Sequence, residues 1–364
     1  AFYDEKMHGC DWNKVRETYR PILADITYKE DFYVLFSLAL GELNASHTGI
    51  AGAREERGAS TASLGVELDD AYAGAGVRVK FVMPKGPADK DGSRLNVGDI
   101  ILKVDGAAVT VNEQFYKLLA DKAGKRVELL VNHEPTEEGA KVLKIRAISG
   151  AEYRRLAYDR WVKEREQITE KLSNGRVGYL HLSAMNDENL ERFKRAVFGD
   201  LQEKDGLVLD VRFNGGGSIA DEILAILQDK VFSYRSMRGD PRQLNAPLHV
   251  WTKPTVVLIN EASFSNAEVF PWGFKALKLG KVVGVPTYGG VIGTGSTTLI
   301  DGSVLRTPTT GAFTLDGVNM ENNGCPPDIY VENSPEDVYQ KRDRQLERAV
   351  QEVMKQGGQK RMGL

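Results

Sequence analysis

The length, composition and charge of the chain limit its class before any motif is considered. Its 364 residues exceed what one ordinary hydrophobic core organises, and its hydrophobic and charged fractions, 41% and 27%, are those of a globular protein, so two or three domains are expected. The formal net charge of -3 without runs of basic residues argues against nucleic acid as the main partner, and no apolar stretch reaches the roughly 18 residues of a membrane span.

The cysteines, the histidines and the start of the chain give few further constraints. Cys10 and Cys325 lack metal-ligand spacing. Four histidines also lack a partner at ligand spacing: His8, His133, His181 and His249. We therefore expect neither a metal site nor a cofactor. The chain begins Ala-Phe-Tyr-Asp, without an initiator Met or a signal-peptide pattern, so we expect a fragment or a processed product, cytoplasmic or alternatively periplasmic.

The N-terminal segment has a helical pattern. Asp11 can cap a helix that runs through Leu23, and residues 29–43 carry apolar side chains at three- and four-residue steps. This second helix leads into a loop that contains Ser46 and His47. Considered alone, His47 is most simply a surface or capping histidine.

Residues 51–62 are rich in Gly, Ala, Ser, Arg and Glu and are interpreted as a linker, after which a small β-rich unit begins. We expect strands at 63–68, 76–82, within 95–106 and at 127–131, and helices at 87–92 and 111–123. The segments Gly86-Pro-Ala and Leu95-x-Val-Gly-Asp-x-Ile-Leu-x-Val-Asp-Gly106 resemble those of PDZ domains. The resemblance implies that residues 63–66 bind a peptide C-terminus, and the alternative is a PDZ-like spacer with a blocked groove.

Beyond a charged helix over residues 151–172, strands and helices alternate. We expect strands at 177–182, 206–211, 255–259 and 281–285, and helices at 187–199, 219–227, 266–279 and 335–355. This alternation predicts an α/β layered domain, so the whole chain is predicted to be a multi-domain α+β protein.

Two serines, Ser263 and Ser265, lie where the strand at 255–259 ends and the next helix begins. A helix N-terminus presents unpaired amides and a positive dipole end, so a serine there can attack a carbonyl while nearby amides stabilise the oxyanion. The simpler alternative is that one of the two serines only caps the helix.

The turn Asn214-Gly-Gly-Gly217 follows another buried strand. Its glycines let backbone amides converge on one point, as an oxyanion site requires, and the absence of a following Gly-Lys-Ser/Thr excludes a nucleotide P-loop. The alternative is a tight strand-to-helix turn. A second glycine cluster at 288–295 lacks the strand–turn–helix frame of a dinucleotide loop.

Taken together, the Ser46-His47 loop, the PDZ-like unit, Asn-Gly-Gly-Gly and Ser-Phe-Ser-Asn-Ala-Glu resemble the tail-specific and tricorn protease family in order and content. The resemblance covers almost the whole chain. Tail-specific members use a lysine base in a Phe-Gly-Lys-Gly segment downstream of the nucleophile. Here Tyr288-Gly-Gly-Val291 places Gly290 at that position, and a glycine cannot take a proton. The Ser/Lys mechanism is therefore excluded.

The tricorn version has no such lysine and resembles this chain at three segments: Gly41-Glu-Leu-Asn-Ala-Ser-His47, Asp210-Val-Arg-Phe-Asn-Gly-Gly-Gly217 and Glu321-Asn-Asn-Gly-Cys-Pro-Pro-Asp328. This resemblance implies a catalytic tetrad. Ser265 attacks the scissile carbonyl and His47 takes its proton. Glu321 orients and polarises the histidine through Ser46.

Two parts of the implied site have alternatives. The carboxylate partner of the histidine side is Glu321, or else Asp316 or Asp328. The oxyanion hole is implied to combine the Asn266 amide with one amide of the turn formed by Gly215 and Gly216, although an acidic residue is expected in the family where Asn266 stands.

The resemblance also implies an organisation and a substrate class. It implies a helical cap domain over 1–58, a PDZ-like domain over 59–150 and a ClpP/crotonase-like α/β protease core over 151–364. Peptides or unfolded proteins are the implied substrates, and the family suggests a homo-oligomer, a hexamer. The chain shows no propeller repeats, so it is either the protease part of a longer protein with upstream β-propellers or a member without them.

The sequence alone decides neither the substrate preference nor between the competing functions. Asp240 could place a carboxylate in a pocket for basic P1 side chains, although a turn aspartate before a proline is the simpler interpretation. One competing function is a non-catalytic binding protein of the same fold, similar to the retinoid-binding proteins of the eye. The other is a crotonase-like acyl-CoA enzyme, which would not need Ser265.

Overall fold

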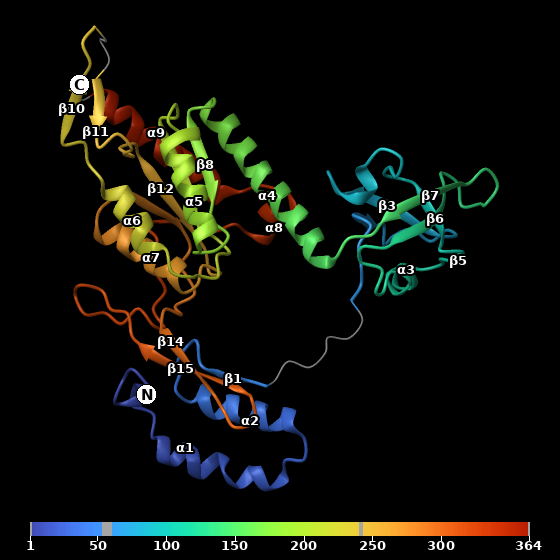
Figure 1. Ribbon diagram of the computed structural model, residues 1–364, viewed down its shortest axis with the longest axis horizontal. Helices are drawn as coiled ribbons and strands as arrows, with labels where there is room; N and C mark the ends of the chain where they lie inside the picture. Colours follow the sequence, from blue (N-terminus) through green and yellow to red (C-terminus); the bar gives the residue numbers. More distant parts are fainter. Residues whose placement is uncertain (1, 53–59, 240–242, 363–364) are drawn as a thin grey trace. The chain divides into compact units, whose positions relative to one another are not determined.

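The computed structural model describes residues 2–52, 60–239 and 243–362 (Figure 1). The chain divides into two compact units, one formed by residues 1–54 with 165–364 and the other by residues 55–164. The prediction of three domains, with boundaries at 58 and 150, stays a prediction.

The first unit begins with the elements η1 (Met7–Gly9), α1 (Trp12–Tyr19), η2 (Pro21–Asp25), α2 (Lys29–Gly41) and β1 (Gly49–Ala51). The second unit contains β2 (Val66–Leu68), β3 (Val77–Val82), η3 (Pro87–Asp89), β4 (Ile100–Val104), β5 (Ala107–Ala108), α3 (Asn112–Leu118), β6 (Arg126–Asn132) and β7 (Lys141–Arg146). The long helix α4 (Gly150–Ser173) belongs to the second unit in its first part and to the first unit in its last.

The first unit then continues to the C-terminus. Its elements are β8 (Val177–His181), α5 (Asp187–Arg195), the π-helical turn η4 (Ala196–Asp200), β9 (Gly206–Asp210), α6 (Ala220–Gln228), β10 (Ser233–Ser236), β11 (Gln243–Ala246), β12 (Thr255–Ile259), α7 (Asn266–Ala276), β13 (Lys281–Gly284), β14 (Gly293–Thr298), β15 (Val304–Thr310), β16 (Ile329–Tyr330), α8 (Pro335–Tyr339) and α9 (Arg344–Met362).

A five-stranded parallel sheet, in the order β16-β13-β12-β9-β8, forms the core of the first unit. Every residue of β8, β9 and β12 is buried, which is typical of a parallel sheet covered on both faces. Apolar side chains of α5, α6 and α7 pack on one face, and α9 contacts the sheet from the other (Figure 1). The carboxyl ends of β9 and β12 lead directly into the two loops singled out by sequence, which confirms the predicted α/β layered domain.

A smaller antiparallel sheet, in the order β1-β15-β14, lies next to the N-terminal helices in the same unit (Figure 1). Strand β1 directly follows the loop of Ser46 and His47, and it pairs with β15 through the register Gly49–Arg306. Helix α2 packs against β1 and α1. The loop with His47 is therefore attached to a sheet built largely from residues 293–310.

The second unit is an antiparallel sheet in the order β2-β3-β4-β6-β7, with β5 paired to β4. Its core is formed by side chains of the strands and of α3, among which Phe115 and Leu129 are almost completely buried. Thr61, expected to belong to a linker, and Ser63, expected to begin a strand, instead form isolated bridges with Ala120 and Ile148. The rest of the expected linker, 53–59, lies outside the described residues.

Several expected helices are shorter than predicted or divided, among them those expected over 87–92, 111–123 and 187–199, and two others show a clear cause. The helix capped by Asp11 ends at Tyr19, because Pro21 follows and starts the separate turn η2. The closing helix expected over 335–355 is two helices, α8 and α9. Asp343 produces this break, since its carboxylate accepts a hydrogen bond from the amide of Leu346 and caps a new helix.

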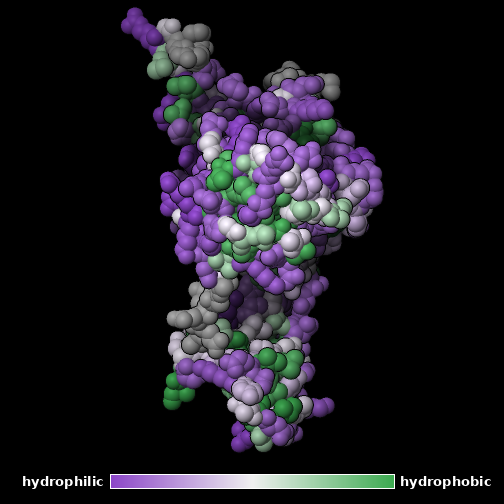
Figure 2. All heavy atoms as spheres, turned by 90° about the vertical axis from the view of Figure 1, so that its right-hand side faces the viewer, coloured by the Kyte–Doolittle hydropathy of each residue, from purple (hydrophilic) through white to green (hydrophobic). Residues whose placement is uncertain are grey.

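Figure 2 shows one face of the molecule, on which hydrophilic residues dominate and hydrophobic ones lie in small groups. Among the described residues, no helix has the length and hydrophobicity needed to cross a bilayer.

Candidate active site

The two serines of the Ser-Phe-Ser motif have different environments. Ser263 is completely buried, where its hydroxyl donates to the Val211 carbonyl (2.9 Å) and accepts from the Asn260 amide (3.1 Å). Ser265 occupies the N-cap position of α7 with φ 59° and ψ −123°, a conformation that residues other than glycine rarely adopt. Its amide donates to the Glu268 carboxylate (3.0 Å). Ser263 is therefore a structural residue, and Ser265 is held in a strained turn.

His47 lies directly against Ser265. Its Nε2 is 3.1 Å from the Ser265 hydroxyl, and its Nδ1 is 2.8 Å from the Ser46 hydroxyl. The ring of Phe264 stacks on the imidazole, with ring centroids 4.6 Å apart and an interplanar angle of 10°. This stacking fixes the plane of the imidazole and excludes water from one of its faces.

Glu321 continues this line of contacts. Its carboxylate accepts hydrogen bonds from the Ser46 hydroxyl (3.0 Å), the Ser46 amide (2.5 Å) and the Val291 amide (2.9 Å). If the Ser46 hydroxyl donates to Glu321, it accepts from Nδ1–H of His47, which leaves Nε2 as an unprotonated acceptor for the Ser265 hydroxyl. That tautomer is the one a general base needs.

The alternative carboxylates lie elsewhere. Asp316 accepts a hydrogen bond from the Thr314 hydroxyl (2.6 Å) in an exposed hairpin. Asp328 accepts from the Val282 amide (2.8 Å), beside the parallel sheet. Among the described carboxylates, Glu321 is the one hydrogen-bonded to Ser46.

The electrostatic surroundings of His47 favour its neutral form. Burial lowers its pKa below the usual value, and the positive charge of Arg306 acts in the same direction, while Glu321 opposes both. The imidazole is therefore unprotonated, and able to accept a proton, at neutral pH.

The glycine turn approaches the nucleophile closely. A Cβ added to Gly216 would lie 2.6 Å from Cβ of Ser265, so only a glycine fits there. The Gly216 amide donates to the Asn214 side chain (2.9 Å), whereas no described residue accepts from the amides of Gly215 and Asn266. Of the three predicted oxyanion-hole residues, Gly215 and Asn266 thus have amides that are available to a ligand.

The side chain of Asn266 has a different contact. Its Oδ1 accepts a hydrogen bond from the Ala220 amide (2.9 Å) at the start of α6. An asparagine in place of the expected acidic residue therefore changes a contact with α6, and the backbone amide of Asn266 remains available.

Sequence analysis missed Glu268. This carboxylate is completely buried and accepts hydrogen bonds from four groups: the amides of Ser265 (3.0 Å), Gly289 (2.5 Å) and Gly290 (2.8 Å), and the hydroxyl of Thr287 (2.6 Å). It holds the strained turn of the nucleophile against the segment 287–291, whose first residues follow β13. The spacing Ser-x-x-Glu from Ser265 to Glu268 is that of a capping box, and it could have identified this contact.

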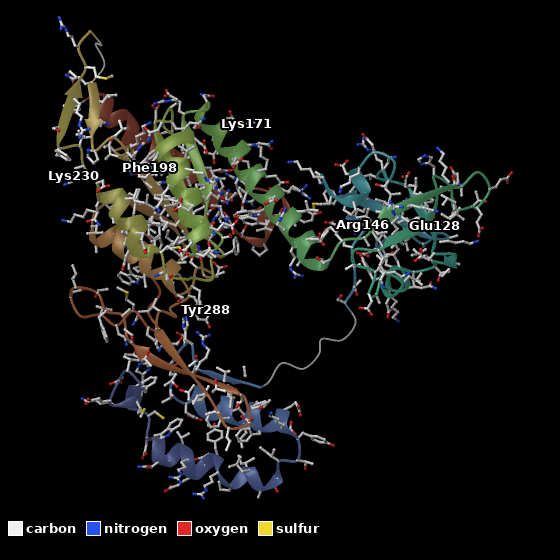
Figure 3. The ribbon with its side chains drawn as sticks, viewed as in Figure 1. Glu128, Arg146, Lys171, Phe198, Lys230 and Tyr288 are labelled. Carbon is white, nitrogen blue, oxygen red and sulfur yellow. The ribbon has the colours of Figure 1, made fainter. Side chains whose placement is uncertain are left out.

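Gly290 has no room for a side chain. A Cβ added there would lie 2.2 Å from Cε2 of Phe264, the ring that stacks on His47. The neighbouring Tyr288, labelled in Figure 3, makes an edge-to-face contact with the same Phe264 ring. A lysine at position 290 is therefore incompatible with the aromatic support of the histidine.

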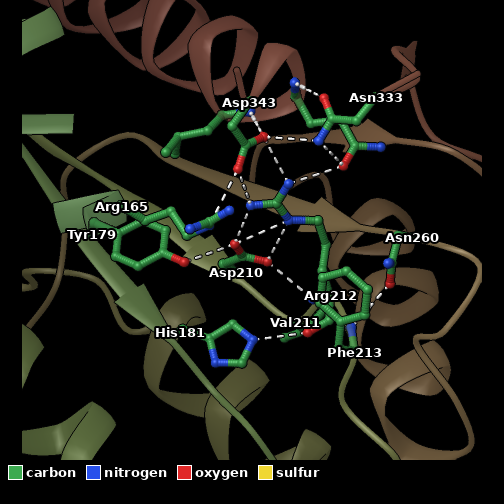
Figure 4. A network of polar contacts seen from close by, with 12 residues as sticks. Arg165, Tyr179, His181, Asp210, Val211, Arg212, Phe213, Asn260, Asn333 and Asp343 are labelled. Carbon is green, nitrogen blue, oxygen red and sulfur yellow. Dashed lines mark hydrogen bonds and ion pairs between the residues drawn. The ribbon is translucent and has the colours of Figure 1, made fainter. Parts of the chain in front are cut away.

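A buried ionic network surrounds Arg212, shortly before the glycine turn in the chain (Figure 4). The Arg212 guanidinium donates to the carboxylates of Asp210 (2.7 Å) and Asp343 (2.9 Å), and Tyr179 also donates to Asp210 (2.9 Å). The carbonyl of Arg212 accepts from Nε2 of His181 (2.8 Å). Burial by itself would lower the pKa of Arg212, but the charges of Asp210 and Asp343 and the hydrogen bonds to them raise it well above its usual value. The network thereby fixes Arg212, two residues before Asn214 begins the turn.

The structure tests neither the role of Asp240 nor the expected absence of a metal site. Asp240 lies outside the described residues. Within the described residues, no group of three His, Cys, Asp or Glu side chains has the arrangement of a metal site.

Comparison with known proteins assigns the family. Residues 176–331 match the family model described as peptidase family S41, so this part of the chain belongs to that family of serine peptidases. Residues 1–41 match the tricorn protease C1 domain, and residues 74–150 match the tricorn protease PDZ domain. In the order of these three segments the chain is similar to the tricorn proteases.

Individual relatives agree with this assignment. Tricorn protease homolog 1 of Streptomyces coelicolor is 33% identical over 96% of this chain and 33% of that protein. The tricorn protease of Thermoplasma volcanium is 28% identical over 97% of this chain and 35% of that protein. The crystal structure of the tricorn protease has the same fold, with a TM-score of 0.81 at 24% identity over 98% of this chain and 35% of that one. The chain thus spans about a third of the length of these relatives.

Proposed function

We propose that this chain is the catalytic part of a serine peptidase that hydrolyses peptide bonds in peptides or unfolded proteins. Ser265 is the nucleophile and His47 the general base, and Ser46 and Glu321 support the histidine. The observation that carries the proposal is the unbroken series of contacts from the Ser265 hydroxyl through His47 and Ser46 to Glu321, at 3.1, 2.8 and 3.0 Å.

The reaction follows from these contacts. The Ser265 oxygen forms a bond to the scissile carbonyl carbon, and its proton passes to Nε2 of His47. The carbonyl oxygen becomes an oxyanion, which the amides of Gly215 and Asn266 stabilise. Losing one such donor typically costs about 3 kcal/mol of barrier. The oxyanion then re-forms the carbonyl, the scissile C–N bond breaks, and His47 gives its proton to the leaving amine, which leaves the acyl group as an ester on Ser265. A water molecule, deprotonated by His47, attacks this ester; its C–O bond to Ser265 breaks, the proton returns to the serine oxygen and the carboxylic acid is released.

Glu321 acts on the charge that develops in this reaction. Proton uptake makes the imidazole positive, and a carboxylate one hydroxyl away stabilises that charge by orienting the Ser46 dipole. In the resting state the nearby Arg306 and burial keep the imidazole neutral. Burial and Arg306 therefore keep His47 neutral, and able to accept a proton, before the reaction, while Glu321 stabilises the imidazolium that forms during it.

The test uses active-site labelling of two serine variants. In the wild-type protein, a fluorophosphonate should form an adduct at Ser265, located by peptide mass mapping. Ser265→Ala should abolish both the adduct and peptide turnover while leaving the melting temperature nearly unchanged. Ser263→Ala should keep both the adduct and peptide turnover but lower the melting temperature, because it removes two buried hydrogen bonds and leaves the nucleophile in place.

Three outcomes would contradict the proposal. Undiminished labelling of Ser265→Ala would assign the nucleophile elsewhere. A folded wild-type protein without an adduct would favour the non-catalytic binding protein of the same fold. Binding of an acyl-CoA without peptide turnover would favour the crotonase-like enzyme.

The family resemblance supports two finer proposals: the protein assembles as a homo-oligomer, a hexamer, and it functions together with β-propeller domains of a longer protein. The sequence of its loop supports a third, that Asp240 selects basic P1 side chains. Light scattering tests the assembly, and a monomer would contradict it. Cleavage of a peptide library by wild-type and Asp240→Asn variants tests the role of Asp240, and an unchanged P1 preference would contradict it.

A further inference from the structure

The two residues proposed to support His47, Ser46 and Glu321, both lie in loops rather than in a helix or strand. Ser46 belongs to the loop between α2 and β1, and Glu321 to the long loop between β15 and β16. Residues on loops are positioned by side-chain contacts rather than by a helix or sheet ladder. The alignment of these two residues therefore depends on what holds the two loops together.

Asn319 connects the Glu321 loop to the N-terminal segment. Its Oδ1 accepts a hydrogen bond from the Glu321 amide (3.1 Å), and its Nδ2 donates to the Tyr3 hydroxyl (3.1 Å). The Tyr3 amide donates to the Pro308 carbonyl (3.1 Å), so the N-terminal segment lies along β15 (Figure 1). A residue that is 316 positions away in sequence thus supports the loop of Glu321.

His8 connects the same segment to the Ser46 loop. Its Nε2 is 2.5 Å from the Tyr3 hydroxyl, and its Nδ1 is 3.0 Å from the Leu43 carbonyl. Leu43 precedes Ser46 by three residues. The contacts therefore close a ring that runs from Leu43 through His8 and Tyr3 to the Glu321 loop and back to Ser46.

The hydrogen atoms in this ring can be assigned in one direction. A carbonyl only accepts, so Nδ1 of neutral His8 carries the proton and Nε2 accepts from the Tyr3 hydroxyl. The Tyr3 oxygen then accepts from the Asn319 amide group. Each member donates to the next, an arrangement in which hydrogen bonds strengthen one another.

A separate contact between the two loops supports the same geometry. The Asn322 side chain donates to the Asn44 carbonyl (2.8 Å). Asn44 has φ 46°, a left-handed conformation that ends the α2 segment and directs the chain toward Ser46.

We propose that Tyr3, His8 and Asn319 are positioning residues of the active site, which hold the Ser46 and Glu321 loops in the alignment that orients His47. The proposal rests on the proposed function, because it assigns these residues a role only through the tetrad. They touch neither Ser265 nor His47, and they act by keeping the Ser46–Glu321 hydrogen bonds formed.

The test measures the rate at which a fluorophosphonate labels Ser265, with melting temperature as a check on folding. Tyr3→Phe keeps the ring and removes only the hydroxyl, so it should slow labelling about three- to tenfold, the effect of one lost hydrogen bond. His8→Gln should slow labelling to a similar extent, because it breaks the ring at the next member. With a peptide substrate, Tyr3→Phe should lower kcat and leave KM unchanged.

A matched control and a double variant separate positioning from general destabilisation. Tyr19→Phe is the same substitution in helix α1, where the hydroxyl donates to Glu42 (2.7 Å), and it should leave the labelling rate unchanged. Glu321→Ala should slow labelling strongly. Adding Tyr3→Phe to Glu321→Ala should then have no further effect, since the residue through which Tyr3 acts is gone.

The possible failures can be distinguished. An unchanged rate in Tyr3→Phe and His8→Gln, with Glu321→Ala slowed, would overturn this inference alone. So would an equal loss from Tyr3→Phe in the presence and absence of the Glu321 carboxylate. A wild-type protein that takes no label at Ser265 would overturn the proposed function and this inference with it.

Discussion

The contribution of the buried network around Arg212 to folding stability can be tested at Asp343. This buried carboxylate accepts from two guanidinium nitrogens of Arg212, at 2.9 and 3.0 Å, and caps α9. Burial by itself would raise the pKa of Asp343, but the charge and hydrogen bonds of Arg212 lower it from 3.8 to about 2. At 1.36 kcal/mol per pKa unit, this difference corresponds to about 2.5 kcal/mol of folding free energy at neutral pH.

The sign of the pH dependence follows from the depressed pKa. An unfolded chain binds the proton at about pH 4, whereas the folded protein resists it until about pH 2. The contribution is therefore present above pH 4 and is lost as the pH falls from about 4 to about 2. Asp343→Asn removes it, so the variant should unfold about 3–5 °C below the wild type at pH 7.

Thermal denaturation followed by circular dichroism at several pH values measures this effect. The difference between wild type and Asp343→Asn should shrink steadily below pH 4. Asp316→Asn is the matched control, since that carboxylate is exposed and accepts from the nearby Thr314 hydroxyl, and its melting temperature should stay close to that of the wild type. Equal melting temperatures of the two variants at pH 7, or a difference that stays constant down to pH 3, would refute the reasoning.

Three further predictions concern the active site. Arg306→Gln removes the positive charge that, after burial, lowers the pKa of His47, so the acidic limb of the kcat/KM profile should move to higher pH; a profile that stays in place or moves to lower pH would contradict this. Gly216→Ala places a Cβ 2.6 Å from that of Ser265 and should lower kcat/KM about a hundredfold, whereas wild-type turnover would show that the turn is not fixed. Asn266→Ala removes a helix contact but keeps the oxyanion amide, so it should cost about 1 kcal/mol of stability, measured by urea denaturation, while labelling stays within about threefold of wild type.

Local sequence patterns predicted the parts of the fold that carry a strong hydrophobic signal. The strand at 255–259 was predicted with its observed bounds, and the helix beginning at 266 starts where expected. Both are largely buried elements, so their apolar residues form a local pattern: a continuous run in the strand and helical spacing in the helix. The Ser46-His47, Asn-Gly-Gly-Gly and Ser-Phe-Ser segments likewise identified the family, because such motifs are local and their order in the chain is preserved.

Strands β14 and β15 illustrate what the local patterns could not predict. Nearly all of their residues are exposed or partly exposed, so they show no alternation of apolar and polar side chains. Each is a strand because of the partner to which it is hydrogen-bonded, and β1 comes from residues far earlier in the chain. Long-range pairing of this kind leaves no local signal.

The sequence by itself therefore determined the family, the α/β core and the identity of the residues proposed to react. The tertiary structure decided how those residues meet. Ser46 and Glu321 are separated by 275 positions, and His47 and Ser265 by 218, so their distances depend on how the cap and the core pack together. The same holds for the carboxylate of Glu268 and the ring of Tyr3, His8 and Asn319, because a hydrogen bond between distant segments exists only once the chain has folded.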